Sequence, residues 1–428
     1  MKFLEPNIVV IDDVKSEVQG ILDYYRELGV GCKLFNASYF DGDTMPSNCF
    51  SDVNLIFLDL YYSERFDAEQ CSNWVQSLVS EKSFYILVLW TKDTSKSNSV
   101  LEHLKQVNRM PFTFLVKSKT DYSKIGEEKY DYSKLFEEIN TELDTIPALE
   151  EIQIWKKSVK HSTNEILGHL TKTSDPNIFN DKLKKIIICH GGGSIKSSSN
   201  NIRKRLILFD ALDSILISNT RKNINENNIT ELNIENLYNL DKVEDSVIDK
   251  ELNSWFHFKL EKNLTNELIS PGIISEFKDN DWRNKYSIHD DKIVMDFISH
   301  QSGNNVKISS IALLLSRPCD IAQNKFGKNL KLLSGLKIVN PIRKENAKKE
   351  FKKGSSNVDS IKIYDHLYLS EEENDVTFLF DFRYTFSVPE ESFKAEFNNI
   401  KIFNKELLSE MQVEYSSYSS RLGITQIF

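Results

Sequence analysis

Short apolar runs alternate with segments of helical periodicity over roughly the first 145 residues. After Asp13, apolar residues recur at the i, i+3, i+4 spacing of an amphipathic helix. The residues in that pattern are Val18, Ile21, Leu22, Tyr25 and Leu28. Further helices are expected at 67–80, 99–107 and 132–143, and strands at 7–11, 32–36, 53–58, 84–90 and 112–116. This alternation predicts an α/β fold, a doubly wound five-stranded parallel sheet with helices on both faces.

The pattern changes twice after this first domain. Pro147 breaks the chain, and the following region is mainly helical with polar, Ser- and Asn-rich interruptions. Beyond Pro271 and Gly272, β-branched and aromatic runs show partial alternation, which is typical of strands. These runs are 292–298, 309–316, 337–339 and 376–386, and a last helix is expected at 404–420. The predicted domains are therefore 1–147 (α/β), 148–268 (a helical middle region) and 269–428 (mixed and β-rich).

Composition narrows the class of protein. A chain of 428 residues exceeds what one hydrophobic core usually supports, which agrees with several domains. The net charge of -9 argues against a dedicated non-specific nucleic-acid binder. No apolar run approaches the roughly 20 residues that span a bilayer, and the first residues lack a signal peptide's apolar stretch, so we expect a cytoplasmic protein. The five cysteines form no CxxC pair, so we expect reduced thiols rather than disulfides or a zinc site.

Acidic residues stand where the predicted strands end. Asp12 and Asp13 follow the first run, and Asp59 follows the third. Because ligands of open α/β sheets bind beyond the carboxyl ends of the strands, these carboxylates should converge. A cluster of this kind suits Mg²⁺, which takes a few carboxylates and several waters. The fourth run ends at Thr91 and the fifth reaches Lys117, adding a hydroxyl and an ammonium group at the same edge. Taken alone, the Asp pair could instead cap a helix.

This constellation resembles the receiver domain of two-component response regulators, over about the first third of the chain. The resemblance implies a flavodoxin-like fold in which Asp59 accepts a phosphoryl group. It implies that Asp12 and Asp13 bind Mg²⁺, helped by the backbone carbonyl of Tyr61. It further implies that Thr91 meets the phosphoryl oxygen, that Lys117 pairs with it, and that Phe114 is the switch aromatic.

Two positions depart from the receiver pattern. Ser118 and Lys119 follow Lys117 where receivers usually have proline, and Lys92 follows Thr91 where a small residue is usual. Lys92 could hinder access to Asp59 or lend a second positive charge. These departures leave open a receiver fold that takes no phosphoryl group and serves as a protein-interaction module.

The remaining two thirds of the chain contain no familiar output module. The sequence His190-Gly-Gly-Gly193 is similar to an oxyanion-hole motif, but no GxSxG nucleophile elbow accompanies it. An apolar run leads to Cys319 and Asp320, which leaves open a receiver-controlled hydrolase with a histidine as base. The candidate histidines are His289, His300 and His366.

The chain is also similar to atypical receivers of bacterial anti-phage systems with a two-component logic, such as Detocs. That resemblance implies a phosphate sink, because no effector motif is present. It implies a histidine kinase as partner, and a second receiver protein of the same system; a homodimer stays open. We therefore expect a phosphoacceptor rather than a conventional turnover enzyme.

Overall fold

The computed structural model describes residues 5–124, 130–172, 175–220, 231–240, 248–259, 264–279, 306–316, 329–341 and 360–420. The chain divides into two compact units. The first comprises Met1–Gln153 and Glu231–Leu237, and the second comprises Ile154–Thr230 and Tyr238–Phe428. The sequence-based boundaries at 147 and 268 stay predictions.

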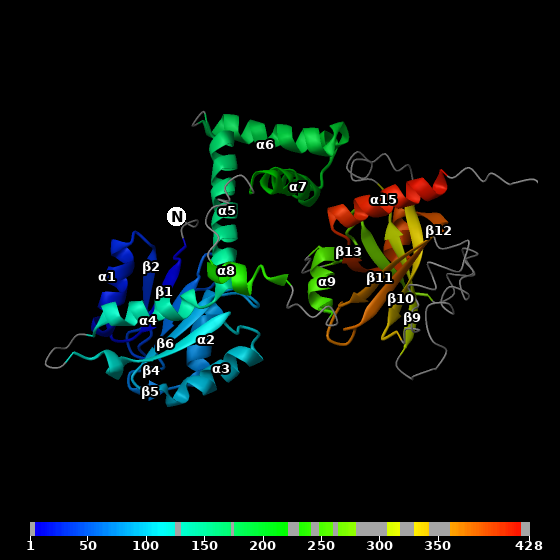
Figure 1. The fold of residues 1–428 in the computed structure, drawn as a ribbon. Helices are drawn as coiled ribbons and strands as arrows, with labels where there is room; N and C mark the ends of the chain where they lie inside the picture. Colours follow the sequence, from blue (N-terminus) through cyan, green and yellow to red (C-terminus); the bar gives the residue numbers. More distant parts are fainter. Residues whose placement is uncertain are drawn as a thin grey trace, which may run out of the picture. The chain divides into compact units, whose positions relative to one another are not determined.

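The first unit contains a five-stranded parallel sheet with helices packed on it (Figure 1). Its strands are β1 (Ile8–Asp12), β2 (Cys32–Asn36), β3 (Leu55–Leu58), β6 (Ile86–Thr91) and β7 (Thr113–Ser118). Their order is β2-β1-β3-β6-β7, which is compatible with the flavodoxin-like arrangement. All five strands lie where the apolar runs predict them, and the parallel α/β sheet is confirmed.

Each face of this sheet is covered by a different pair of helices. One face packs against α1 (Gln19–Glu27) and α4 (Tyr132–Asp144). The other packs against α2 (Ala68–Leu78) and α3 (Ser97–Gln106). Successive strand residues point to opposite faces, so Val10 and Phe57 belong to the first core and Ile11 and Leu58 to the second. Burial on both faces explains why the strands read as continuous apolar runs.

Short elements follow the strands at the carboxyl edge of the sheet. They are η1 (Lys15–Glu17), the two-stranded hairpin of β4 (Tyr61–Tyr62) and β5 (Arg65–Phe66), η2 (Thr94–Lys96) and η3 (Lys119–Tyr122). Sequence patterning predicted none of them. They bring side chains back over the ends of the strands.

Helices dominate the middle of the chain, as predicted. They are α5 (Pro147–Leu170), α6 (Pro176–Gly191), η4 (Gly193–Ser197), α7 (Asn201–Thr220), α8 (Glu231–Asn236) and α9 (Lys250–His257). His190 and Gly191 end α6, Gly192 has a positive φ, and Gly193 begins η4, so the His-Gly-Gly-Gly sequence forms a helix end. Within the described residues, no helix has the length and apolar character needed to cross a membrane.

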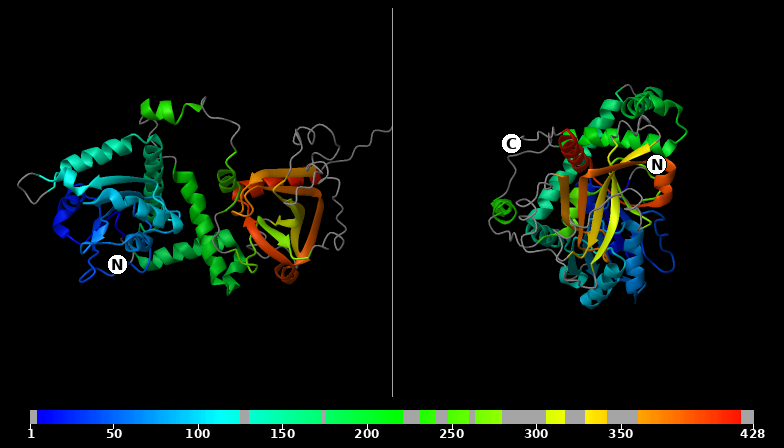
Figure 2. Two further views of the ribbon diagram at one scale, coloured as in Figure 1. Left: turned by 90° about the horizontal axis from the view of Figure 1, so that it is seen from below. Right: turned by 90° about the vertical axis from the view of Figure 1, so that its right-hand side faces the viewer.

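The C-terminal part contains an antiparallel six-stranded sheet in the order β11-β12-β10-β9-β8-β13 (Figure 2). These strands are β8 (Ile273–Phe277), β9 (Lys307–Leu314), β10 (Asn329–Val339), β11 (Ile361–Leu367), β12 (Val376–Pro389) and β13 (Phe397–Ile402). The helix α14 (Glu390–Glu396) follows β12, and α15 (Lys405–Ser419) packs on the sheet through Leu408 and Met411. The β-rich character of this region is therefore confirmed.

Several sequence-based expectations fall on residues that the structure does not describe. They are the strand at 292–298, His289, His300, Cys319 and Asp320. The other four cysteines, Cys32, Cys49, Cys71 and Cys189, are free thiols. His366 is described and lies in β11, within a bulge between Tyr364 and Leu367.

Candidate functional site

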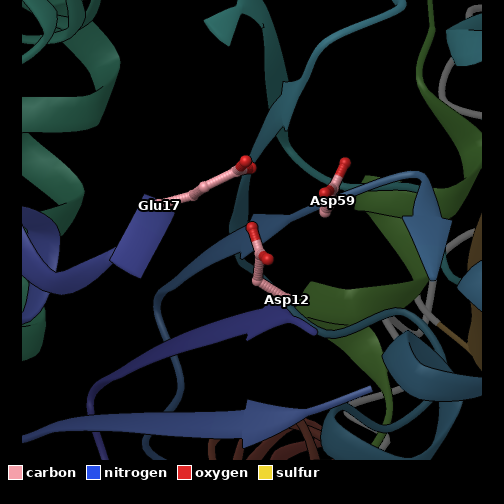
Figure 3. Close-up of side chains that lie close together, drawn as sticks. All are labelled: Asp12, Glu17 and Asp59. Atoms are coloured by element: carbon pink, nitrogen blue, oxygen red, sulfur yellow. The ribbon is translucent and has the colours of Figure 1, made fainter. Parts of the chain in front are cut away.

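Asp12 and Asp59 lie together at the carboxyl edge of the parallel sheet. Asp12 is the last residue of β1, Asp59 directly follows the neighbouring β3, and both side chains are buried. Glu17, at the end of η1, points its carboxylate toward them (Figure 3). Oxygen atoms of the three carboxylates all lie within 4.8 Å of one another. The predicted convergence of Asp12 and Asp59 is thus found, with Glu17 as a third member that sequence reasoning missed.

The backbone holds both aspartates in place. Asp12 Oδ1 accepts a hydrogen bond from the N–H of Val14 at 2.7 Å, and Asp59 Oδ1 accepts one from the N–H of Leu60 at 2.7 Å. One oxygen of each carboxylate is therefore fixed by the loop that follows its strand. The second oxygen of each is directed to a shared partner.

That partner is Lys119, the first residue of η3. Its ammonium nitrogen lies 2.7 Å from Asp12 Oδ2, 2.7 Å from Asp59 Oδ2 and 2.8 Å from Glu17 Oε2. The lysine side chain is 0% exposed. A lysine ammonium has three protons to donate, and all three find a carboxylate here. One fully buried cation thus joins three acids that lie between 60 and 107 residues away from it in the sequence.

The charges in this cluster shift one another's protonation. Burial raises the pKa of Asp12 to about 7, and the nearby charge of Asp59 adds to this, although Lys119 opposes it. Burial disfavours the charged form of Lys119, but Asp12 and Asp59 outweigh it and raise the pKa of its ammonium group. Lys119 is therefore a permanent cation, whereas Asp12 changes its charge near neutral pH.

Glu17 is held at both its side chain and its backbone. Its Oε1 pairs with Lys92 at 2.5 Å, while its Oε2 pairs with Lys119. Its backbone carbonyl accepts hydrogen bonds from Trp90 Nε1 at 3.3 Å and from the Tyr132 hydroxyl at 3.0 Å. Burial alone would raise the pKa of Glu17, but the hydrogen bonds from the two lysines lower it. Glu17 is consequently an ionised carboxylate between two cations.

Lys117 is not brought to the acids, although the resemblance assigns it to them. Its ammonium group lies 2.5 Å from Glu142 Oε1 and 3.1 Å from Glu138 Oε2, both on α4. The reason is the length of β7, which continues to Ser118, two residues beyond the end of the predicted strand. The lysine that reaches the carboxyl edge is therefore Lys119. Glu138 and Glu142 are four residues apart and so lie on the same face of α4. This spacing was the feature of the sequence that could have predicted their pairing with Lys117.

Asp13 does not belong to the acidic trio. Its Oδ2 accepts a hydrogen bond from the N–H of Ser63 at 2.5 Å, at the turn between β4 and β5. Ser63 and Glu64 both have positive φ, as a tight two-residue hairpin turn requires. The N-caps of η1 and α1 are Val14 and Val18, so neither member of the Asp pair is an N-cap residue.

Three further predicted residues lie on elements around the acids. Tyr61 begins the β4–β5 hairpin, and its N–H also contacts Asp59 Oδ1, at 3.4 Å; its carbonyl stays a predicted ligand. Thr91 ends β6 as expected and is fully buried, and its hydroxyl has no hydrogen-bond partner within the described part of the chain. Phe114 lies in β7 with 41% of its surface exposed, and its switch role stays a prediction.

The donor set fits a hard divalent cation. Carboxylate oxygens are the ligands that such ions prefer, and the trio of Asp12, Glu17 and Asp59 brings oxygens together at a suitable spacing. A cation binds the ionised form of a carboxylate. Because the pKa of Asp12 is raised, Asp12 must lose its proton before a metal ion can bind there. A metal ion would also compete with Lys119 for the same oxygens. The acidic trio could therefore bind a metal ion.

Comparisons with known proteins add little to this geometry. No family model matches the chain, and no curated protein matches it. A solved structure described as a yeast Spc42 trimeric coiled coil fused to another structure is similar at 18% identity and a TM-score of 0.18. The match covers 28% of this chain and 72% of that chain. A TM-score that low supports no inference about fold or function.

Proposed function

We propose that this protein is a phosphoacceptor that takes a phosphoryl group from a histidine kinase onto Asp59, in a reaction that needs Mg²⁺. The observation that carries the proposal is the contact of Lys119 Nζ with both Asp59 and Asp12 at the carboxyl edge of a parallel sheet. An acceptor carboxylate, a second acid and a buried lysine are the groups that a receiver needs. Lys119 takes the role that the resemblance assigns to Lys117.

The chemistry follows from the charges. A carboxylate oxygen of Asp59 attacks phosphorus, and the phosphorus–nitrogen bond of the phosphohistidine breaks. The imidazole leaves with the electron pair of that bond. The barrier is largely electrostatic, because two anions must meet. Lys119, whose neighbours keep it charged, is placed to neutralise oxygens that develop charge beside Asp59.

Of the acidic trio, Asp12 and Asp59 are the residues that would hold Mg²⁺ during transfer, whereas Glu17 could contribute an oxygen only in the resting protein. When bound, the ion supplies further neutralisation of the phosphoryl charge. The hydroxyl of Thr91 is buried without a partner in the described residues, and so is available to a newly bound oxygen. An unpaired buried hydroxyl lowers the stability of a folded protein, and binding of a phosphoryl oxygen would explain why this one is present.

The second unit supplies no catalytic group to this proposal. We propose that its helices and its antiparallel sheet serve in partner binding, and that the whole chain acts in signal transduction as a cytoplasmic phosphate sink within a kinase-based anti-phage system. The absence of an effector motif in the sequence supports the sink role. A second receiver protein of the same system would then compete for the same kinase.

Labelling with a small phosphodonor tests the acceptor role. Full-length protein is mixed with acetyl phosphate and MgCl₂, and its intact mass is measured over time. Wild type should gain one phosphoryl group, and Asp59→Ala should gain none. An Asp59→Ala protein that labels as fast as wild type would overturn the proposal. A folded wild type that takes no label, even from a cognate phosphorylated kinase, would favour the non-phosphorylated interaction module.

A further inference from the structure

The carboxylate of Glu17 is shared between two lysines that come from different strand ends. Its Oε1 lies 2.5 Å from Lys92 Nζ and its Oε2 lies 2.8 Å from Lys119 Nζ. Lys92 directly follows β6 and Lys119 directly follows β7. Two ammonium groups therefore hold the two oxygens of one oxyanion, next to the oxygens of Asp59.

We infer that Lys92 and Lys119 form a binding site for a phosphate-like oxyanion, which Glu17 occupies in the resting protein and must leave when the ligand binds. This inference rests on the proposed function, since the site lies beside the proposed acceptor. A carboxylate and a phosphoryl group both present pairs of anionic oxygens, and lysine binds either as a point charge. Glu17 thus acts as an internal competitor of the donor's phosphoryl group.

Exposure indicates the route by which the ligand arrives. Lys119 is 0% exposed and Asp59 is 8% exposed, whereas the Lys92 side chain is 62% exposed. Glu17, at 15%, pairs with both lysines and so links the exposed one to the buried one. An incoming anion therefore meets Lys92 first and reaches Lys119 only after the Glu17 carboxylate has moved.

The backbone of Glu17 can stay in place while its side chain leaves. Trp90 and Tyr132 both donate hydrogen bonds to the Glu17 carbonyl and not to its carboxylate. The ring of Tyr132 packs on Gly20, where an added Cβ would come within 2.1 Å of a ring carbon. Displacement of Glu17 consequently costs two ion pairs with lysines, and the binding of the anion replaces both.

Charge favours the exchange. The three carboxylates and two lysines of the cluster carry a net charge of about -1 when all are ionised, so an incoming anion is repelled. Rotation of Glu17 toward solvent removes one negative charge from the site, frees the ammonium group of Lys92 and leaves Lys119 paired with Asp12 and Asp59 alone. Replacing Glu17 by its neutral amide should produce the same change permanently.

The test compares variants at saturating Mg²⁺, titrated separately for each because Glu17 also belongs to the acidic trio. Labelling rates are measured against acetyl phosphate concentration. Glu17→Gln should lower the half-saturating concentration by about fivefold, the size expected for one nearby charge. Lys92→Met should raise it, and Glu17→Gln combined with Lys92→Met should lose the gain. Glu27→Gln and Lys105→Met, exposed residues on α1 and α3, are charge-matched controls that should behave as wild type.

A second readout separates this inference from the proposed function. Inorganic phosphate is titrated into the same variants carrying Asp59→Ala, and the shift in melting temperature is measured, with no transfer step involved. Phosphate should stabilise the Glu17→Gln protein more than the Glu17 protein, and Lys92→Met should reduce that effect. Equal shifts in all three proteins would overturn the oxyanion site even if Asp59 is phosphorylated. The expected shifts with no labelling of Asp59 would support the oxyanion site and contradict the acceptor role.

Discussion

Lys119 Nζ lies 2.7 Å from Asp59 Oδ2, although 60 residues separate the two in the sequence. The contact joins the end of β7 to the end of β3 across the intervening strand β6. It brings a lysine whose side chain is fully buried to the proposed acceptor.

Lys119 and Lys117 should differ sharply when each is replaced by methionine. Lys119→Met leaves Asp12 and Asp59 buried without their cation, and should lower the free energy of unfolding by about 3 kcal/mol at pH 7. Lys117→Met removes pairs with glutamates that are 38% and 49% exposed, and should cost about 1 kcal/mol. Urea unfolding gives both values, and acetyl phosphate labelling should be lost only in Lys119→Met. If labelling is lost in Lys117→Met and retained in Lys119→Met, then Lys117 and not Lys119 is the lysine that pairs with the phosphoryl group.

Much of the first unit could be predicted from sequence because its strands are buried on both faces. A strand such as β6, with six buried residues, reads as an uninterrupted apolar run. The end of β7 could not be read in this way, because Lys117 and Ser118 are polar yet continue the strand. Two residues of strand length decide which lysine reaches the acids.

Glu17 escaped prediction because nothing apolar marks η1. It lies in a short turn between β1 and α1, and only the fold brings that turn to the end of β7. In the second unit, β13 was missed because Asn398 and Asn399 lie within it, and asparagine disfavours strands. β13 pairs with β8, which is more than 100 residues earlier in the chain, and local sequence patterns cannot predict a pairing over such a separation.

The stability of the metal-free protein should depend on pH through Asp12. Burial, chiefly, raises the pKa of Asp12 to about 7 in the folded state, so the folded protein binds this proton more tightly than the unfolded chain does. This tighter binding of the Asp12 proton contributes fully to the unfolding free energy below pH about 4, and the contribution is lost as the pH rises through 7. In EDTA, the unfolding free energy of wild type relative to Asp12→Asn should therefore fall between pH 5 and pH 8. A difference that is constant with pH would contradict this protonation.

Divalent ion binding should show the opposite dependence and should distinguish the two adjacent aspartates. Because a divalent cation binds the ionised form of a carboxylate, the stabilising effect of Mg²⁺ should grow from pH 6 to pH 8, as Asp12 loses its proton. Asp12→Asn should weaken Mg²⁺ binding at least tenfold, as expected for a direct ligand. Asp13→Asn should weaken it less, since Asp13 Oδ2 bonds the N–H of Ser63. Calorimetric titration with MgCl₂ measures both, and a larger loss in Asp13→Asn would restore the ligand set implied by the receiver resemblance.

Thr91→Val should separate folding from phosphoryl transfer. The Thr91 hydroxyl has no hydrogen-bond partner among the described residues, so its removal should leave stability unchanged or raise it by up to about 1 kcal/mol. Labelling of Asp59 should nevertheless slow, because an oxygen of the bound phosphoryl group loses its donor. Thr91→Ser, which keeps the hydroxyl, is the matched control and should label close to the wild-type rate. Equal rates in both variants would remove Thr91 from the site.

Chemical mapping of the phosphorylated residue tests the central claim most directly. Protein labelled with acetyl phosphate and Mg²⁺ is treated with borohydride, which reduces an aspartyl phosphate to homoserine, and the digested peptides are sequenced by mass spectrometry. Homoserine should appear at position 59 and should be absent from positions 12 and 13. Homoserine at position 12 or 13 in place of 59, or at none of the three in folded protein, would contradict the assignment of Asp59 as phosphoacceptor.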